Sequence, residues 1–148
     1  DSTLVCRQLA RTRIVLCAAP GYLAAHGTPR VPADLASHTV IAYSYWSGGD
    51  EWQFDGPDGR VSVRTRPAVH TNSGDTCRTA ALQHQGIGLV ADFAAQAVLH
   101  SGALVQVLPD WQLTSNYAPR TAYALYMPSR HLPLKVRALI DHLVQAAA

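Results

Sequence analysis

The sequence lacks an apolar run of about 18 residues, the length that a helix needs to span a bilayer. Charge is also scarce, at 15% of the 148 residues, and the twelve basic residues are scattered along the chain. Nucleic-acid binding normally requires a basic stripe on one face. We therefore expect no membrane partner, and no nucleic-acid contact through this chain itself.

Cysteine is the next scarce residue, and three thiols are too few and odd in number for a disulfide framework. Cys6, Cys17 and Cys77 sit in apolar or helical contexts, which predicts small buried thiols in a reducing compartment and hence a cytoplasmic location. Methionine occurs once, at Met127, and the opening DSTLV has no charged segment followed by an apolar one. We expect a piece of a larger protein, without a signal peptide.

Motifs for catalysis and metal binding are missing as well. The seven histidines are dispersed, with no H-E-x-x-H and no C-x-x-C, so we expect no metal site. No G-x-S-x-G elbow is present, and Ser73-Gly74 lacks the buried strand that precedes such a nucleophile. Cys77 lies in the first turns of a predicted helix, which favours a thiolate, but packing beside Ala80 and Ala81 is the better interpretation. We predict no enzyme activity.

One glycine motif has the spacing of a cofactor loop. Residues 86–91, GIGLVA, fit the G-x-G-x-x-A variant of the dinucleotide fingerprint. That fingerprint needs a strand before the glycines and a helix after them, because the pyrophosphate binds at the helix N-terminus. Here the predicted helix comes first and the apolar strand follows. We therefore expect no nucleotide cofactor, and we predict that Gly86 is the first residue beyond the end of the helix.

The first half of the chain does carry clear strand patterns. Apolar, β-branched runs at residues 2–9, 13–19 and 39–46 predict strands, and the continuous apolar character of the third indicates burial on both faces. Two short helical segments, at residues 21–27 and 32–38, separate the second strand from the third. Strict alternation after residue 51 predicts a hairpin around turn-forming residues 55–59, with these apolar residues on its two arms: Trp52, Phe54, Val61 and Val63.

The second half alternates helices and strands. A helix begins with Asp92 as its predicted N-cap and ends at Ser101-Gly102, and residues 103–109 and 121–128 predict strands. The last helix starts near Pro133 and has apolar residues at the spacing of one face: Val136, Leu139, Ile140, Leu143 and Ala147. The whole pattern predicts an α/β fold with a mixed sheet.

A binding signal lies where two predicted strands end. The first group follows the apolar strand, at the carboxyl end where open α/β sheets have their ligand crevices: Tyr43, Ser44, Tyr45, Trp46 and Ser47. The second group lies between another strand and a helix N-terminus, whose unpaired N–H groups can bind an anion: Thr71, Asn72, Ser73 and Asp75. Ordinary helix capping by Asn72 or Ser73 is the safer interpretation of the second group, although the two roles are compatible.

Five segments in order resemble the effector-binding domain of LysR-type transcriptional regulators. They are RIVLCAAPGYLAAHGTPRVPADLASH, the W-x-F of Trp52-Gln53-Phe54, TNSGDTCRTAALQHQGIGLV, GALVQVLPDW and SRHLPLKVRALIDHLV. The similarity covers nearly the whole chain, so it is more specific than any single motif. One departure is Val90-Ala91, where family members commonly have Leu-Pro.

The resemblance implies one lobe of a two-lobed, periplasmic-binding-protein-like effector domain. Residues 1–12 would be a remnant of the first lobe with a crossover strand, residues 13–119 the second lobe, and residues 120–148 the returning strand and C-terminal helix of the first lobe. It also implies a winged helix-turn-helix, absent from this chain, that binds promoter DNA. The expected partners are a small polar or carboxylate effector bound between the lobes, and further copies of the chain in a dimer or tetramer.

The resemblance also assigns residues to these roles. The segment 43–47 and the residues Thr71, Asn72 and Ser73 would face the effector. The helix at about residues 74–85 would serve side-by-side dimerisation, through Asp75, Arg78, Thr79, Leu82 and Gln83. An exported solute-binding protein shares the two-lobed plan and is the main rival, and a small enzyme is the third class. We further expect the apolar face of the last helix to favour self-association.

Overall fold

The computed structural model describes residues 4–43, 50–114, 117–128 and 133–146. The chain divides into two compact units, Asp1–Thr12 with Arg120–Ala148, and Arg13–Pro119. These limits coincide with the segments that the sequence suggests, whereas the assignment of the units to lobes stays a prediction. Each unit is described by itself, and the predicted effector residues Ser44, Tyr45, Trp46 and Ser47 lie outside the described residues.

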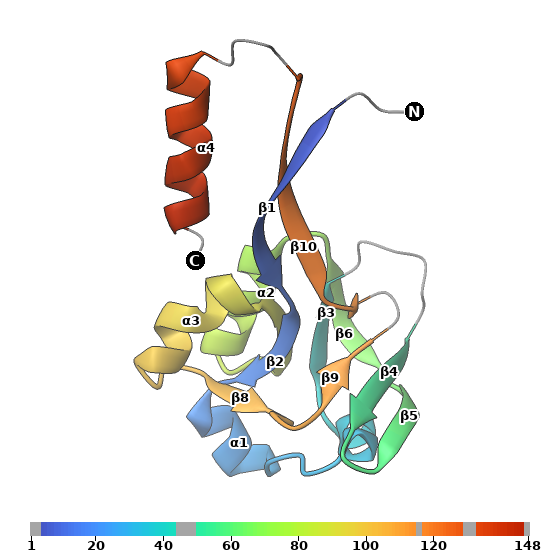
Figure 1. Cartoon of the computed structure of the whole chain (residues 1–148). Coiled ribbons are helices and arrows are strands. Elements are labelled where there is room, and N and C mark those ends of the chain that lie inside the picture. The colour runs from blue at the N-terminus through green and yellow to red at the C-terminus, as the bar shows by residue number, and fades with distance from the viewer. Residues whose placement is uncertain (1–3, 44–49, 115–116, 129–132, 147–148) are drawn as a thin grey trace. The chain divides into compact units, whose positions relative to one another are not determined.

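The smaller unit is a two-stranded ribbon with one helix. Strands β1 (Val5–Thr12) and β10 (Arg120–Tyr126) pair antiparallel, and helix α4 (Leu134–Ala146) lies beside β1 (Figure 1). An ion pair of 2.7 Å joins Arg7 Nη1 to Asp141 Oδ1, and Ile140 is buried. Other apolar side chains of α4 remain exposed, with 81% for Leu134, 57% for Leu139 and 39% for Leu143. Of the predicted apolar face, Leu139 and Leu143 are therefore exposed, whereas Val136 is half-buried and Ile140 is buried.

The larger unit contains a five-stranded mixed sheet in the order β6-β3-β7-β2-β8 (Figure 1). Its strands are β2 (Ile14–Ala18), β3 (Val40–Tyr43), β6 (Pro67–Thr71), β7 (Ile87–Ala91) and β8 (Val105–Val107). Strand β3 runs parallel to β6 and β7, whereas β2 runs antiparallel to β7 and β8. The predicted α/β fold with a mixed sheet is thereby confirmed.

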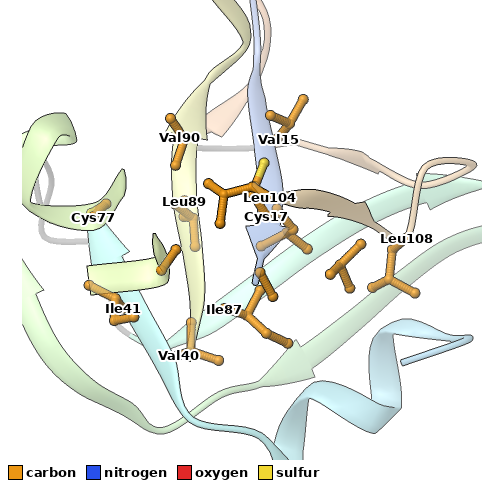
Figure 2. Packing of buried hydrophobic residues seen from close by; sticks show 14 of the residues in the cluster. Val15, Cys17, Val40, Ile41, Cys77, Ile87, Leu89, Val90, Leu104 and Leu108 are labelled. Atoms are coloured by element: carbon orange, nitrogen blue, oxygen red, sulfur yellow. The ribbon is translucent and has the colours of Figure 1, made fainter. Parts of the chain in front are cut away.

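Helices α2 (Gly74–Leu82) and α3 (Asp92–His100) pack on the central strands β7 and β2. The short helix α1 (Pro20–His26) and the 3₁₀ helix η1 (Pro32–Ser37) connect β2 to β3. Figure 2 shows part of the buried cluster, to which β7 contributes Ile87, Leu89 and Val90, β2 contributes Val15 and Cys17, and β3 contributes Val40 and Ile41. The inner strands β2, β3 and β7 are apolar and mostly buried, as expected for strands covered on both faces.

Small residues let α2 approach the sheet closely. A Cβ atom at Gly88 of β7 would lie 2.7 Å from the Cys77 carbonyl oxygen and 3.2 Å from the Ala81 Cβ. Cys77 and Ala81 are themselves fully buried on the inner face of α2. The run of small residues in this helix is therefore explained by contact of its backbone with β7.

A second, three-stranded sheet has the order β5-β4-β9, from β4 (Glu51–Gly56), β5 (Gly59–Arg64) and β9 (Gln112–Leu113). Trp52 and Phe54 are buried on its inner face, as the alternation predicts. The hairpin turn is shorter than predicted, because Asp55 and Gly56 still pair with β5. Strand β9 was not predicted, since two residues are too few to carry a pattern.

Three local predictions were wrong. Helix α2 ends at Leu82, earlier than residue 85, and His84 takes the left-handed conformation expected of Gly86. Gly86 is required for another reason: a Cβ there would lie 2.5 Å from the Thr39 carbonyl oxygen. The N-cap of α3 is Ala91, and Asp92 is its first residue, whose Oδ1 accepts a hydrogen bond of 2.8 Å from the Phe93 N–H. Cys6 is exposed, because it lies on the ribbon.

Candidate functional site

The two predicted polar groups meet where β3 and β6 end. Tyr43 and Thr71 are register partners in this parallel pair, so they lie side by side at the same edge of the sheet. The chain turns directly after Thr71 into α2, whose N-cap is Ser73. The described members of both groups, Tyr43 with Thr71, Asn72 and Ser73, thus share one edge of the larger unit.

Hydroxyl groups organise the helix start. Thr71 Oγ1 accepts a hydrogen bond of 3.1 Å from the Ser73 N–H, and Ser73 Oγ accepts one of 3.3 Å from the Thr76 N–H. Ser73, one of the two residues predicted to cap the helix, is therefore the N-cap. Both bonds use oxygen lone pairs, so capping still leaves each hydroxyl its own O–H for donation. Capping and ligand binding are accordingly compatible at both residues.

Charge on α2 is arranged away from the sheet. Asp75 is 80% exposed and accepts a hydrogen bond of 3.0 Å from Arg78 Nη2. Among the described residues, the buried Nε of Arg78 has no hydrogen-bond partner. Asn72 is exposed, while Thr71 and Ser73 are half-buried. The edge therefore offers neutral donors and a helix N-terminus, with a carboxylate turned outward beside an Arg.

Tyr117 also belongs to this edge, although no sequence pattern predicts it. Its hydroxyl donates a hydrogen bond of 2.9 Å to the Tyr43 carbonyl oxygen, and its ring contacts Trp52 edge-on with centroids 5.8 Å apart. Burial raises the pKa of Tyr117, with smaller contributions from Cys77 and Asp50 nearby. Tyr117 remains protonated and so holds the end of β3 as a donor. The only signal was a single aromatic residue in a segment without periodicity.

The buried thiols are unreactive. Burial raises the pKa of Cys17 to about 12 and that of Cys77 to about 11. Because the thiolate is the nucleophile, neither sulfur has the character of a catalytic group at neutral pH. For Cys77 desolvation outweighs its position near the start of α2, in agreement with the packing interpretation.

Neither a metal site nor a membrane-spanning helix is present among the described residues. Within the described ranges, no cluster of three or more His, Cys, Asp or Glu side chains could hold a metal ion. None of the helices in the described part of the chain is long and apolar enough to cross a membrane.

The sequence matches the family model described as "LysR substrate binding domain" over residues 1–148. The chain belongs to this family. Effector binding is the role of the LysR substrate-binding domain, and the family is one of transcriptional regulators rather than of enzymes. Its structural relatives have the periplasmic-binding-protein-like fold, which agrees with the mixed sheet described above.

Curated LysR relatives are about twice as long as this chain. It is 34% identical over 137 residues to "Probable HTH-type transcriptional regulator LtrA" of Klebsiella pneumoniae, covering 93% of this chain and 44% of that protein. It is 35% identical over 145 residues to "HTH-type transcriptional activator AaeR" of Escherichia coli K12, covering 97% and 45%. The chain thus spans less than half the length of either relative.

Solved LysR-type regulatory domains have the same fold. The regulatory domain of AphB from Vibrio vulnificus superposes with a TM-score of 0.81 at 30% identity, covering 99% of this chain and 70% of that one. The CrgA regulatory domain from Neisseria meningitidis gives 0.80 at 27%, covering 100% and 71%.

Proposed function

We propose that this chain is the effector-sensing part of a cytoplasmic LysR-type regulator that binds promoter DNA through a domain outside this chain. The larger unit would be the second lobe of the effector domain, and the smaller unit part of the first. The membership of the family and the regulators among its relatives support this proposal.

The effector is a small polar compound, and we favour a carboxylate. One observation carries this choice: the carboxyl ends of β3 and β6 are adjacent, and a capped helix starts directly behind them. Thr71 and Ser73 supply hydroxyl donors and Asn72 an amide, while the N-terminus of α2 favours negative charge. Among the residues that the family resemblance assigns to the site and that lie outside the described ranges, Ser44 would add a donor, and Tyr45 and Trp46 would form aromatic walls. Tyr43 and Ser47 complete this segment facing the effector.

Effector binding would be transmitted through α2. The helix begins at the candidate site and presents Asp75, Thr79 and Gln83 to solvent, with Arg78 and Leu82 half-buried beside them. These are the residues that the family resemblance assigns to dimer contacts. A ligand that favours one arrangement of α2 by about 1 to 3 kcal/mol is sufficient to change the geometry of an oligomer on DNA.

A thermal-shift screen of small carboxylates against the intact two-lobed effector domain tests the proposal, because a ligand that binds only the native state raises the unfolding temperature. Ser73→Ala and Asn72→Ala should each reduce the shift given by any active compound. Ser101→Ala is the matched control, since this exposed serine lies beyond the far end of α3. Equal shifts in all three variants would contradict the site, and a shift from neutral sugars alone would contradict the carboxylate.

A further inference from the structure

Tyr22 joins three elements of the larger unit through one buried hydroxyl. Its side chain comes from α1 and is 3% exposed. The hydroxyl lies 3.2 Å from Nδ1 of His38, which follows η1, and it accepts a hydrogen bond of 3.0 Å from the N–H of Thr39, which precedes β3. We call Tyr22, His38 and Thr39 the Tyr22 cluster. It fixes the entry of the chain into β3.

The direction of the bonds follows from counting protons. The Thr39 N–H can only donate, so the Tyr22 oxygen is its acceptor. In the neutral tautomer of His38 that is protonated on Nε2, Tyr22 donates its own proton to His38 Nδ1. This tautomer is the one that gives the buried Tyr22 O–H an acceptor among the described residues. A protonated His38 would turn a second N–H toward the Tyr22 oxygen and leave the buried O–H without its acceptor, at a free-energy cost.

His26, the other histidine on Tyr22, makes a hydrogen bond that a charged ring can also make. Its ring stacks on Tyr22 with centroids 4.4 Å apart, and its Nδ1 lies 3.0 Å from the Tyr22 carbonyl oxygen. A carbonyl only accepts, so Nδ1 of His26 carries a proton in the neutral and the charged ring alike. Charge on His26 is thus compatible with its bonds, and a cation over a tyrosine ring is favourable. Of the two histidines on Tyr22, only His38 must remain neutral.

The surrounding charges act on His38 in both directions. Burial lowers the pKa of His38, and His26 lowers it further, whereas Asp34 of η1 raises it. Asp34 stays ionised because the backbone N–H groups of Arg30 and Val31 lower its pKa. From the turn after α2, His84 places its ring against Gly21 of α1 and is a further titratable group beside this helix.

We propose that the Tyr22 cluster is an acid-sensitive lock on the start of β3. Protonation of His38 removes the acceptor of the Tyr22 hydroxyl and weakens the attachment of Thr39 to α1. The Thr39 carbonyl oxygen also accepts a hydrogen bond of 2.9 Å from the Ile87 N–H, so the loosened residue lies between β3 and β7. The other end of β3 is Tyr43, at the candidate effector edge. Acid thus acts on the strand that carries the site.

The sign of the effect follows from linkage. The pKa of His38 is lower in the folded chain than its ordinary value of 6.5, so the unfolded chain binds this proton more readily. The contribution of neutral His38 to the free energy of unfolding is complete above pH 6.5. It is lost as the pH falls from 6.5 toward the lower pKa that His38 has in the folded chain. The hydrogen bonds of the Tyr22 cluster are therefore intact at neutral pH and weakened in acid.

The test uses the 148-residue chain and needs no ligand. Long-range ¹H–¹⁵N NMR of wild type should find neutral His38 protonated on Nε2, with a pKa below the ordinary histidine value of 6.5. Thermal unfolding should be measured at about pH 7.5 and about pH 5.5, which bracket histidine titration. His38→Gln retains an acceptor for Tyr22 but cannot titrate, so its midpoint should fall less on acidification than that of wild type.

Two further variants give the controls. His142→Gln, on the exposed face of α4, should leave the acid-induced shift of the midpoint as in wild type. His26→Gln should raise the pKa of His38, because the positive charge that lowers this pKa is removed. The proposal is overturned if neutral His38 carries its proton on Nδ1, or if His38→Gln and wild type lose equal stability in acid.

Discussion

The two units of this chain bury their apolar residues to very different extents. In Arg13–Pro119, strands of two sheets and the inner faces of α2 and α3 enclose a continuous core that includes Trp52 and Phe54. In the smaller unit Ile140 is buried, but Leu125, Met127 and Leu134 are more than half exposed. The larger unit therefore has the interior of an independent domain, whereas the smaller one has apolar surface for another structure to cover.

The largest effect is expected in the core of the larger unit. Phe54 is fully buried, so Phe54→Ala should lower the free energy of unfolding by about 3 to 5 kcal/mol. Phe93→Ala, at a residue that is 72% exposed, is the matched control and should change it by less than about 0.5 kcal/mol. Urea denaturation measures both. A small loss for Phe54→Ala would show that the core is less closed than described.

The two units are expected to differ in the reactivity of their thiols. Cys6 is exposed on β1, whereas burial raises the pKa of Cys77 from an ordinary 9.0 to about 11. Two pKa units leave about 100-fold less thiolate on Cys77 at neutral pH, and restricted access slows it further. A disulfide reagent followed by peptide mass spectrometry should therefore modify Cys6 first. Modification of Cys77 at a similar rate in the folded chain would contradict its burial.

The close contact between α2 and β7 predicts a moderate effect. Gly88→Ala would place a methyl group against the Cys77 carbonyl oxygen and should cost about 1 to 3 kcal/mol of stability. Gly74→Ala is the control, since nothing lies within 4 Å of a Cβ at that position. Equal denaturation midpoints for the two variants would mean that α2 does not rest on Gly88.

Removing the Tyr117 hydroxyl should have a smaller effect. Tyr117→Phe keeps the ring on Trp52 but deletes the hydrogen bond to Tyr43, at a cost of about 0.5 to 1.5 kcal/mol. Hydrogen exchange should rise at the end of β3 and stay unchanged in the β4–β5 hairpin. Tyr123→Phe, on the exposed face of β10, should change neither quantity. If amide hydrogen exchange at the end of β3 were the same in Tyr117→Phe as in wild type, Tyr117 would not stabilise the candidate edge.

The smallest stability change is expected on α4. Leu139→Glu replaces a 57% exposed leucine and should alter unfolding by less than about 0.5 kcal/mol, yet reduce self-association through the apolar face. Sedimentation velocity compares it with Gln145→Glu, which adds the same charge at another exposed position of α4. A wild-type chain that sediments as a monomer would contradict self-association by this face.

Sequence periodicity predicted most of the helices and strands, and tertiary contacts explain the predictions that failed. The hairpin and the buried strands followed from the alternation around Trp52 and from apolar runs such as residues 39–46. The end of α2 did not, because Gly86 is required by its approach to Thr39 while His84 takes the left-handed position. Asp92 looked like a cap, but β7 runs directly into α3 through Ala91.

The candidate edge was predictable only where residues are close in sequence to a strand end. Thr71 and Ser73 follow one strand, and Tyr43 ends another, so their meeting follows from parallel pairing. Tyr117 reaches the same edge from a contact 74 residues away, and no local pattern encodes such a distance. The effector assignment of this edge remains a prediction.

The contact at Gly88 also limits how α2 responds to a ligand. The Cys77 carbonyl group and the Ala81 methyl group of the helix rest directly on Gly88 of β7. Sideways sliding would force Cys77 and Ala81 over the larger side chains of the neighbouring strands, whereas tilting keeps the contact intact. The contact therefore opposes any sideways shift of α2 across the sheet, whatever binds at the capped end of the helix.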